Sequence, residues 1–326
     1  MNRRETLAAF VALGGGSSAA RAQPAPRIAR IGFLSLNRGG DRRAADGFNK
    51  GLRELGYVDG RNVVIEDRDA NGRIDRLPAL AAELVALKVD VIVAPSTPAA
   101  QAAKQTTTTI PVIFAGAAEP VTDGLVASLA RPAGNLTGLS NVSADLVGKR
   151  LELLKQTVPK LSRIAVFWQP APGRTAEDML KTADVAARAL GIQLQQVEVG
   201  GAADLDRAFA DIMRAGAGAL TVLPIATFFS ERRRIIDMAA KNRLPAVYPS
   251  RAFVADGGLM AYGADLTDLL RRAAGFAVRI LKGARPSELP VEQATKFELV
   301  INRGTAKALG LTIPPSVLLS ADEVIG

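Results

Sequence analysis

Small hydroxyl and carboxyl side chains stand directly after short apolar runs, at positions where they could bind a small polar molecule. Ser96 and Thr97 follow the apolar run 89–94 and open a predicted helix. The free N–H groups and hydroxyls at such a helix start favour an anion such as a carboxylate. Glu119 follows the next apolar run, 110–115, and could pair with an ammonium group. Side by side, the two loops could bind a zwitterionic head group.

Both features also have an ordinary structural interpretation. Ser96 or Thr97 could be only a helix cap, because serine and threonine are common at that position. Glu119 could be only an acid in the first turn of a helix beginning near Thr122, since acids stabilise that end of a helix. Both alternatives stay open at this point.

Other candidate residues stand at the ends of further predicted strands. Trp168 is the single tryptophan and precedes Gln169 at the end of one strand. It could stack on a ligand or fill the core at a strand end. The remaining candidate ligand-binding residues also lie at strand ends, in the loops that follow them, or at the junction of the two halves: Ser35, Gly116, Ser140, Thr227, Phe228, Tyr248 and Tyr262.

The composition excludes several kinds of chemistry. The chain of 326 residues has no cysteine and no histidine, which removes disulfides, thiol nucleophiles and Cys/His zinc sites. It also lacks the commonest general base, a nucleophile elbow and a phosphate-binding loop of the Walker type. We therefore expect a protein that is not an enzyme and has no metal and no cofactor. A secreted α/β enzyme that uses carboxylates remains the less favoured alternative.

The positive charge does not point to nucleic acid. The net charge is +9, but lysine and arginine are scattered along the chain. A nucleic-acid-binding protein would concentrate them and interleave aromatic side chains. The single run of arginines, 232–234, lies in a predicted helix and fits a solvated face. We expect no nucleic-acid partner.

The elements that must position the candidate residues alternate between strand and helix. Segments that read as strands occur in two groups, 30–35, 63–68, 89–93 and 110–115, then 163–168, 192–199, 218–223 and 244–248. Residues 89–93 and 110–115 are short apolar runs typical of buried parallel strands. Helical patterns lie between them. The alternation predicts parallel sheets covered on both faces, and two groups of similar size predict two Rossmann-like α/β lobes. The segment 134–141, rich in turn-forming residues, is the predicted junction.

The first residues predict an export signal. Arg3 and Arg4 form a basic start, residues 7–13 an apolar stretch, and 20–22 a small-x-small cleavage pattern. We expect residues 1–22 to be a signal peptide and the mature protein to be periplasmic.

Several motifs together resemble one known family. Residues 55–63, 110–116, 130–138, 295–302 and 306–310 resemble the ABC transporter substrate-binding proteins that include tryptophan/tyrosine-type members. The resemblance covers roughly residues 28–325. It departs from the family pattern at Glu119, where the family commonly has Asp before proline, and at Ser96, where it often has glycine.

The resemblance implies a type I periplasmic-binding fold with a ligand between two lobes joined by three crossovers. We expect one lobe from residues 28–140 plus about 264–286, and the other from 141–263 plus about 287–326. The expected crossovers lie near 138–141, 262–265 and 285–290.

The implied function is to bind a small amino-acid-like or carboxylate ligand and to present it to an ABC permease and its ATPase. We expect a monomer. The alternative within the same fold is a sensory module that signals to a membrane receptor, and sequence does not separate the two.

Overall fold

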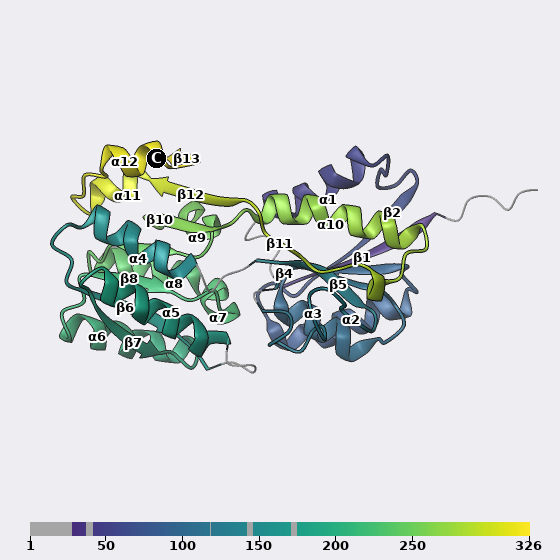
Figure 1. Cartoon of the computed structure of the whole chain (residues 1–326), viewed down its shortest axis with the longest axis horizontal. Helices are drawn as coiled ribbons and strands as arrows, with labels where there is room; N and C mark the ends of the chain where they lie inside the picture. The colour runs from purple at the N-terminus through teal and green to yellow at the C-terminus, as the bar shows by residue number, and fades with distance from the viewer. Residues whose placement is uncertain (1–27, 37–41, 118, 142–145, 171–174) are drawn as a thin grey trace, which may run out of the picture.

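The chain folds into two α/β lobes that lie side by side (Figure 1). The computed structural model describes residues 28–36, 42–117, 119–141, 146–170 and 175–326. The predicted signal peptide, residues 1–22, lies outside the described residues. Each lobe is built on one sheet with helices on both faces, as the alternation of strands and helices predicts.

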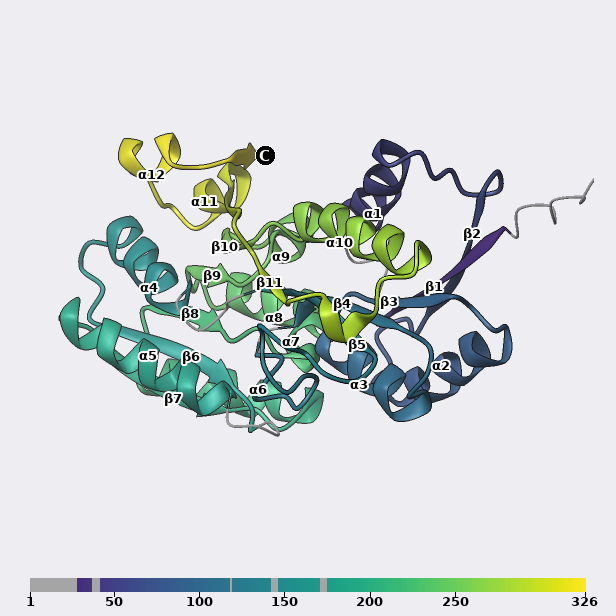
Figure 2. The ribbon, with the colours of Figure 1, turned by 45° about the vertical axis from the view of Figure 1, so that its right-hand side comes forward.

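The first lobe contains a six-stranded parallel sheet in the order β11-β5-β4-β3-β1-β2. Its strands are β1 Ala29–Ser35, β2 Val63–Asp69, β3 Val91–Ala94, β4 Val112–Ala117, β5 Leu136–Ser140 and β11 Glu292–Gln293. Its helices are α1 Arg42–Glu54, α2 Leu77–Ala86, α3 Thr97–Thr106 and α10 Leu266–Leu281, with the 3-10 turns Ile74–Arg76 and Pro286–Glu288. Helices α1 and α10 cover one face, and α2 and α3 cover the other (Figures 1 and 2).

The second lobe contains a seven-stranded sheet in the order β13-β12-β10-β9-β8-β6-β7. Its strands are β6 Arg163–Trp168, β7 Gln193–Glu198, β8 Ala219–Val222, β9 Ala246–Tyr248, β10 Met260–Ala264, β12 Phe297–Asn302 and β13 Glu323–Ile325. Only the β10–β12 pair among these strands is antiparallel. The helices are α4 Leu146–Thr157, α5 Thr175–Ala189, α6 Leu205–Arg214, α7 Ala226–Ser230, α8 Arg232–Lys241, α9 Arg251–Ala255, α11 Arg303–Ala308 and α12 Pro315–Leu319, with the 3-10 turn Ala202–Asp204.

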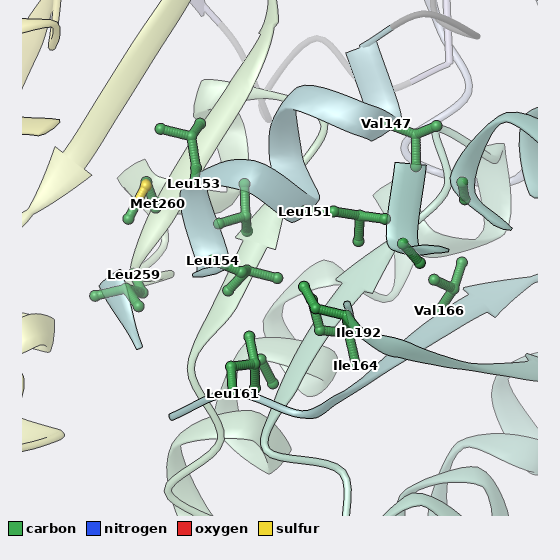
Figure 3. Close-up of a cluster of buried hydrophobic side chains, with 14 of the residues drawn as sticks. Val147, Leu151, Leu153, Leu154, Leu161, Ile164, Val166, Ile192, Leu259 and Met260 are labelled. Atoms are coloured by element: carbon green, nitrogen blue, oxygen red, sulfur yellow. The ribbon is translucent and has the colours of Figure 1, made fainter. Parts of the chain in front are cut away.

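Each face of each sheet has its own apolar core. In the second lobe, α4 packs on the sheet through residues spaced three and four apart, among them Val147, Leu151 and Leu154 (Figure 3). These side chains contact Ile164 and Val166 of β6, and all five are fully buried. Burying one such side chain stabilises the fold by about 1.5–3 kcal/mol. The opposite face is covered by α6, α7, α8 and α9.

The predicted junction contains a strand that the sequence did not reveal. Leu136–Ser140 is β5, and all its residues are buried. Gly138 stands there because of close packing, since a Cβ atom at this position would lie 1.9 Å from the carbonyl oxygen of Phe114. A glycine that signals a turn in sequence here allows two strands to approach.

The third crossover also lies later than predicted. Strand β11 pairs with β5, so residues 287–293 lie with the first lobe and not with the second. The carbonyl of Leu289 accepts a hydrogen bond from Thr137 Oγ1 at 2.6 Å, which fixes this segment against β5. The chain therefore returns to the second lobe near Lys296. Its carbonyl accepts from the backbone N–H of Asp265 at 3.0 Å, so the second and third crossovers are joined.

Candidate functional site

The strand orders of the two sheets locate the candidate site. The consecutive strands of each lobe run β2-β1-β3-β4-β5 and β7-β6-β8-β9-β10, so the order reverses beside β1 and beside β6. Open parallel sheets bind ligands beyond the carboxyl ends of their strands at such a reversal. Ser35 ends β1, Ser96 follows β3, Trp168 ends β6 and Thr227 follows β8. The structure thus places these predicted residues at the two switch points.

The carboxyl ends of the two sheets face each other. Ser230 ends α7, which follows β8, and Gly72 follows β2. Ser230 Oγ donates a hydrogen bond to the carbonyl oxygen of Gly72 at 3.2 Å, so the lobes touch at this point. Figure 1 shows α7 on the side of the second lobe that faces the first. Loops from both switch points therefore border the same interlobe region.

The loops after β3 and β4 lie side by side, as the sequence predicted. Ser96 caps α3, because its Oγ accepts from the backbone N–H of Ala99 at 3.4 Å. Thr97 Oγ1 donates to a carboxylate oxygen of Asp123 at 3.4 Å, which joins the two loops. The carbonyl of Glu119 accepts from the N–H of Asp123 at 2.7 Å. Residues 120–124 form turns rather than the helix expected near Thr122.

Gly116 has a backbone conformation that other residues rarely adopt. Its φ is +98°, and the β4–β5 register shifts between Ala115 and Ala117. A Cβ atom here would lie 3.4 Å from a methyl group of Leu266. This bulge turns the chain towards Glu119 at the edge of the sheet, and bulges commonly re-aim side chains beside functional sites.

Ser35 and Ser140 are more deeply buried than the other first-lobe candidates. Ser35 is 3% exposed, and its Oγ donates to the carbonyl of Arg68 at 3.4 Å. Ser140 is 2% exposed, and its carbonyl accepts from the N–H of Ala294. Both therefore hold neighbouring strands together at the carboxyl edge.

Gln169 joins three loops of the second lobe. Its Nε2 donates to the carbonyl of Gly200 at 2.8 Å, and its Oε1 accepts from Thr227 Oγ1 at 2.9 Å. The amide thus connects the ends of β6 and β7 to the start of α7. Trp168 beside it is half-buried against the core below α4 and α5. Sequence predicted Gln169 and Thr227 separately, and the structure brings them together.

Two predicted aromatic residues belong to the core instead. Phe228 is fully buried against Phe167, with ring centroids 6.4 Å apart. Tyr248 is 1% exposed and stacks on Phe253 at 4.7 Å, and this burial raises the pKa of its phenol. Both side chains pack among the apolar residues of the sheet face that α6 to α9 cover. We therefore leave them out of the proposed site.

Tyr262 stands near the end of β10, beside the second crossover. Its ring is half-buried and lies 6.5 Å from the ring of Phe297, centroid to centroid. Its carbonyl oxygen accepts a hydrogen bond from Nε of Arg150 at 2.8 Å. Tyr262 thus remains a candidate. Its partner Arg150 is a residue that the sequence analysis did not single out.

Arg150 is a buried cation on α4. It is 1% exposed, and burial lowers the pKa of its guanidinium to about 9. Its Nη1 atom is buried without a hydrogen-bond partner among the described residues. The sequence gives little sign of this beyond the apolar neighbours of Arg150 on α4, among them Val147, Leu151 and Leu154.

A cavity of about 550 Å³ lies elsewhere, at the amino ends of the first-sheet strands. It is lined by residues at the start of β1, just before β3 and β4, and around the end of α10, among them Asp90, Thr109 and Arg285. Because ligands of such sheets bind at the carboxyl ends, we do not assign this cavity to the candidate site.

The described residues lack two features. They contain no cluster of three or more acidic side chains that could hold a metal ion. None of their helices combines the length and the apolar character that crossing a bilayer requires.

Comparison with known proteins decides the family. The profile of the ABC transporter substrate binding protein family matches residues 35–325. The chain belongs to this family. The resemblance noted in the sequence is therefore confirmed, as is the solute-binding role that it implied. The family is named for binding a substrate and not for catalysing a reaction.

Three related proteins support the assignment of this chain to the family. A tyrosine-binding protein of Clostridioides difficile is 30% identical over 285 residues, which cover 86% of this chain and 79% of the relative. A Streptococcus pneumonia protein solved in complex with L-Trp is 28% identical, with a TM-score of 0.82 over 91% of this chain and 99% of that one. A substrate binding protein of Clostridium difficile, solved ligand-free and open, is 26% identical, with a TM-score of 0.68 over 91% and 99%. The predicted type I periplasmic-binding fold is thus confirmed.

Proposed function

We propose that this protein binds an amino acid or a closely related carboxylate between its lobes. The observation that carries the proposal is the kinship with relatives that bind tyrosine and tryptophan, across most of the chain. The loops at the two switch points support it, because they border the interlobe region, where Ser230 of the second lobe contacts Gly72 of the first.

The first lobe would hold the head group of the ligand. The start of α3 offers backbone N–H groups to a carboxylate. Thr97 holds Asp123 of the adjoining loop in place, and Glu119 in that loop offers its carboxylate to an ammonium group. The backbone at Gly116, Ser35 and Ser140 shapes the same edge. A zwitterionic amino acid satisfies both signs of charge.

The second lobe would contact the ligand from the opposite side. Trp168 offers a large half-buried ring beside Gln169, whose amide is already fixed by Gly200 and Thr227. A fixed polar group loses less entropy on binding than a mobile one. The ring of Tyr262 completes this side.

Binding would favour the closed arrangement of the lobes. A ligand that contacts both lobes binds the closed form better than the open form, and this difference in affinity shifts the population. The chain is less similar to the open, ligand-free relative, with a TM-score of 0.68, than to the L-Trp complex, with a TM-score of 0.82. The joined crossovers near Asp265 and Lys296 would absorb the motion.

The protein would work outside the cytoplasm and without chemistry of its own. Residues 1–22 would direct export, and the closed, liganded monomer would bind an ABC permease that works with its ATPase. Intact residues 1–22 on protein recovered from the periplasm would contradict the export step.

The test is a ligand screen on freshly purified protein. Native mass spectrometry would show a small molecule that co-purifies, and thermal shift against the amino acids would identify the class. We expect a rise in melting temperature with at least one amino acid. No shift with any amino acid, together with a shift by sugars, would refute the ligand class.

A further inference from the structure

The protein leaves the charge of Arg150 without compensation. The side chain is 1% exposed in the second turn of α4, and its Nε donates to a backbone carbonyl. Its Nη1 has no hydrogen-bond partner among the described residues, and no carboxylate is among the groups that influence its pKa. A buried ion of this kind is costly, and an apolar side chain of similar size would serve the fold at least as well. The position therefore calls for a functional explanation.

The guanidinium lies at the carboxyl edge of the second sheet. Strand β9 ends at Tyr248, which pairs with Ala261, and the next residue is Pro249, which has no N–H to continue the ladder. The carbonyl of Tyr262 therefore lies just past the end of β9, and Arg150 reaches it there at 2.8 Å.

The course of α4 agrees with this placement. The helix begins at Leu146, shortly after the crossover from β5, and leads to the amino end of β6 at Arg163. Its first two turns therefore lie towards the carboxyl edge, where the ends of β6, β8 and β10 border the interlobe region. Arg150 stands in the second of these turns.

We propose that Arg150 binds, from the second lobe, the same ligand carboxylate that faces the start of α3 in the first lobe. A guanidinium presents a planar fork of donors that matches a carboxylate, and the ligand would supply the missing negative charge. The inference deepens the proposed function and rests on it, because it requires a ligand between the lobes. A pKa of about 9 keeps the group cationic at neutral pH.

The experiment compares acids with the amines that lack their carboxylate. Calorimetry would measure L-tryptophan against tryptamine, L-tyrosine against tyramine, and also L-glutamate, succinate and glucose. The variants are Arg150→Met, which keeps length but removes charge, and Arg150→Lys, which keeps charge but removes the fork. Lys149→Met is the matched control, because it removes an exposed charge from the same helix.

We expect the wild type to bind at least one acid more tightly than its amine. Arg150→Met should weaken that acid roughly 10- to 100-fold, which corresponds to losing a hydrogen bond to a charged group. The amine should bind the wild type and Arg150→Met equally. Arg150→Lys should retain part of the preference for the acid, and it carries the test if Arg150→Met does not fold. Lys149→Met should bind like the wild type.

Several outcomes would overturn the inference. Equal affinity of folded Arg150→Met and wild type for the acid would show that Arg150 does not touch the ligand. Equal weakening of acid and amine would reduce Arg150 to a residue that positions Tyr262. Binding of glucose alone would refute the role of Arg150 and leave solute binding intact. If the wild type binds none of these compounds, the proposed function itself is refuted.

Discussion

Replacing Arg150 by methionine should stabilise the ligand-free protein. Burial lowers the pKa of Arg150 to about 9, against an ordinary value of about 12.5. A tenfold change in proton affinity is worth about 1.4 kcal/mol, so burying the charged form costs on the order of 4–5 kcal/mol. Methionine leaves the carbonyl of Tyr262 without its donor, which costs about 1–3 kcal/mol. The expected net gain is about 1–4 kcal/mol.

The same cost makes the stability of the wild type depend on pH. Because the pKa of Arg150 is lower in the folded protein, the unfolded chain holds more protons once the pH passes about 9. The free energy of unfolding of the wild type should therefore rise with pH from there, and the full cost applies below. Arg150→Met lacks this contribution, so its advantage over the wild type should shrink between about pH 8 and about pH 11.

Urea unfolding followed by circular dichroism measures both effects, provided that the two lobes unfold in one transition. Lys149→Met serves as the control and should change stability by less than about 0.5 kcal/mol, as exposed substitutions do. A loss of more than about 1 kcal/mol in Arg150→Met at neutral pH would refute the reasoning. It would mean that the guanidinium is well satisfied and holds the fold.

Three further substitutions test other parts of the site and fold. Ser230→Ala removes the interlobe hydrogen bond to Gly72, so ligand affinity should fall by up to roughly tenfold, and X-ray scattering should show a larger radius of gyration without ligand. An unchanged scattering curve and affinity would dismiss this contact as a closing device. Gly138→Ala should lower stability by about 1–3 kcal/mol in thermal unfolding, because its Cβ would overlap the carbonyl of Phe114; a melting temperature equal to that of the wild type would argue against that overlap. Thr97→Val keeps the shape but removes the hydroxyl that bonds Asp123 and fixes the adjoining loop, and calorimetry should show a loss of about 1.5–3 kcal/mol of affinity; full affinity would place the head group elsewhere.

The strands at the centres of the sheets could be predicted from the sequence, because each is buried on both faces and is therefore apolar throughout. Val91–Ala94 is fully buried, and its apolar run is visible without a structure. Strand β5 was missed because Gly138 and Thr137 look like turn residues, and only the approach of Phe114 explains the glycine. The pairing of β11 with β5 joins residues about 150 apart, and no local pattern indicates it.

The site was predictable where it depends on strand ends and not where it depends on side-chain direction. Ser96 and Thr97 follow a strand and open a helix, and both facts are local. Tyr248 also ends a strand, but neighbouring residues of a strand point to opposite faces, and Tyr248 points into the core. Arg150 could not be recognised, because its hydrogen-bond partner is the carbonyl of Tyr262, which lies 112 positions further along the chain.

Hydrogen–deuterium exchange with and without L-tryptophan or L-tyrosine, whichever binds, tests the central claim most directly. If the ligand lies between the lobes, exchange should slow in peptides from both sides, 94–106 and 119–126 in the first lobe and 166–170 and 225–231 in the second. Protection confined to one lobe would contradict the account. Protection around the cavity lined by Asp90, Thr109 and Arg285 would place the ligand at the opposite end of the first sheet.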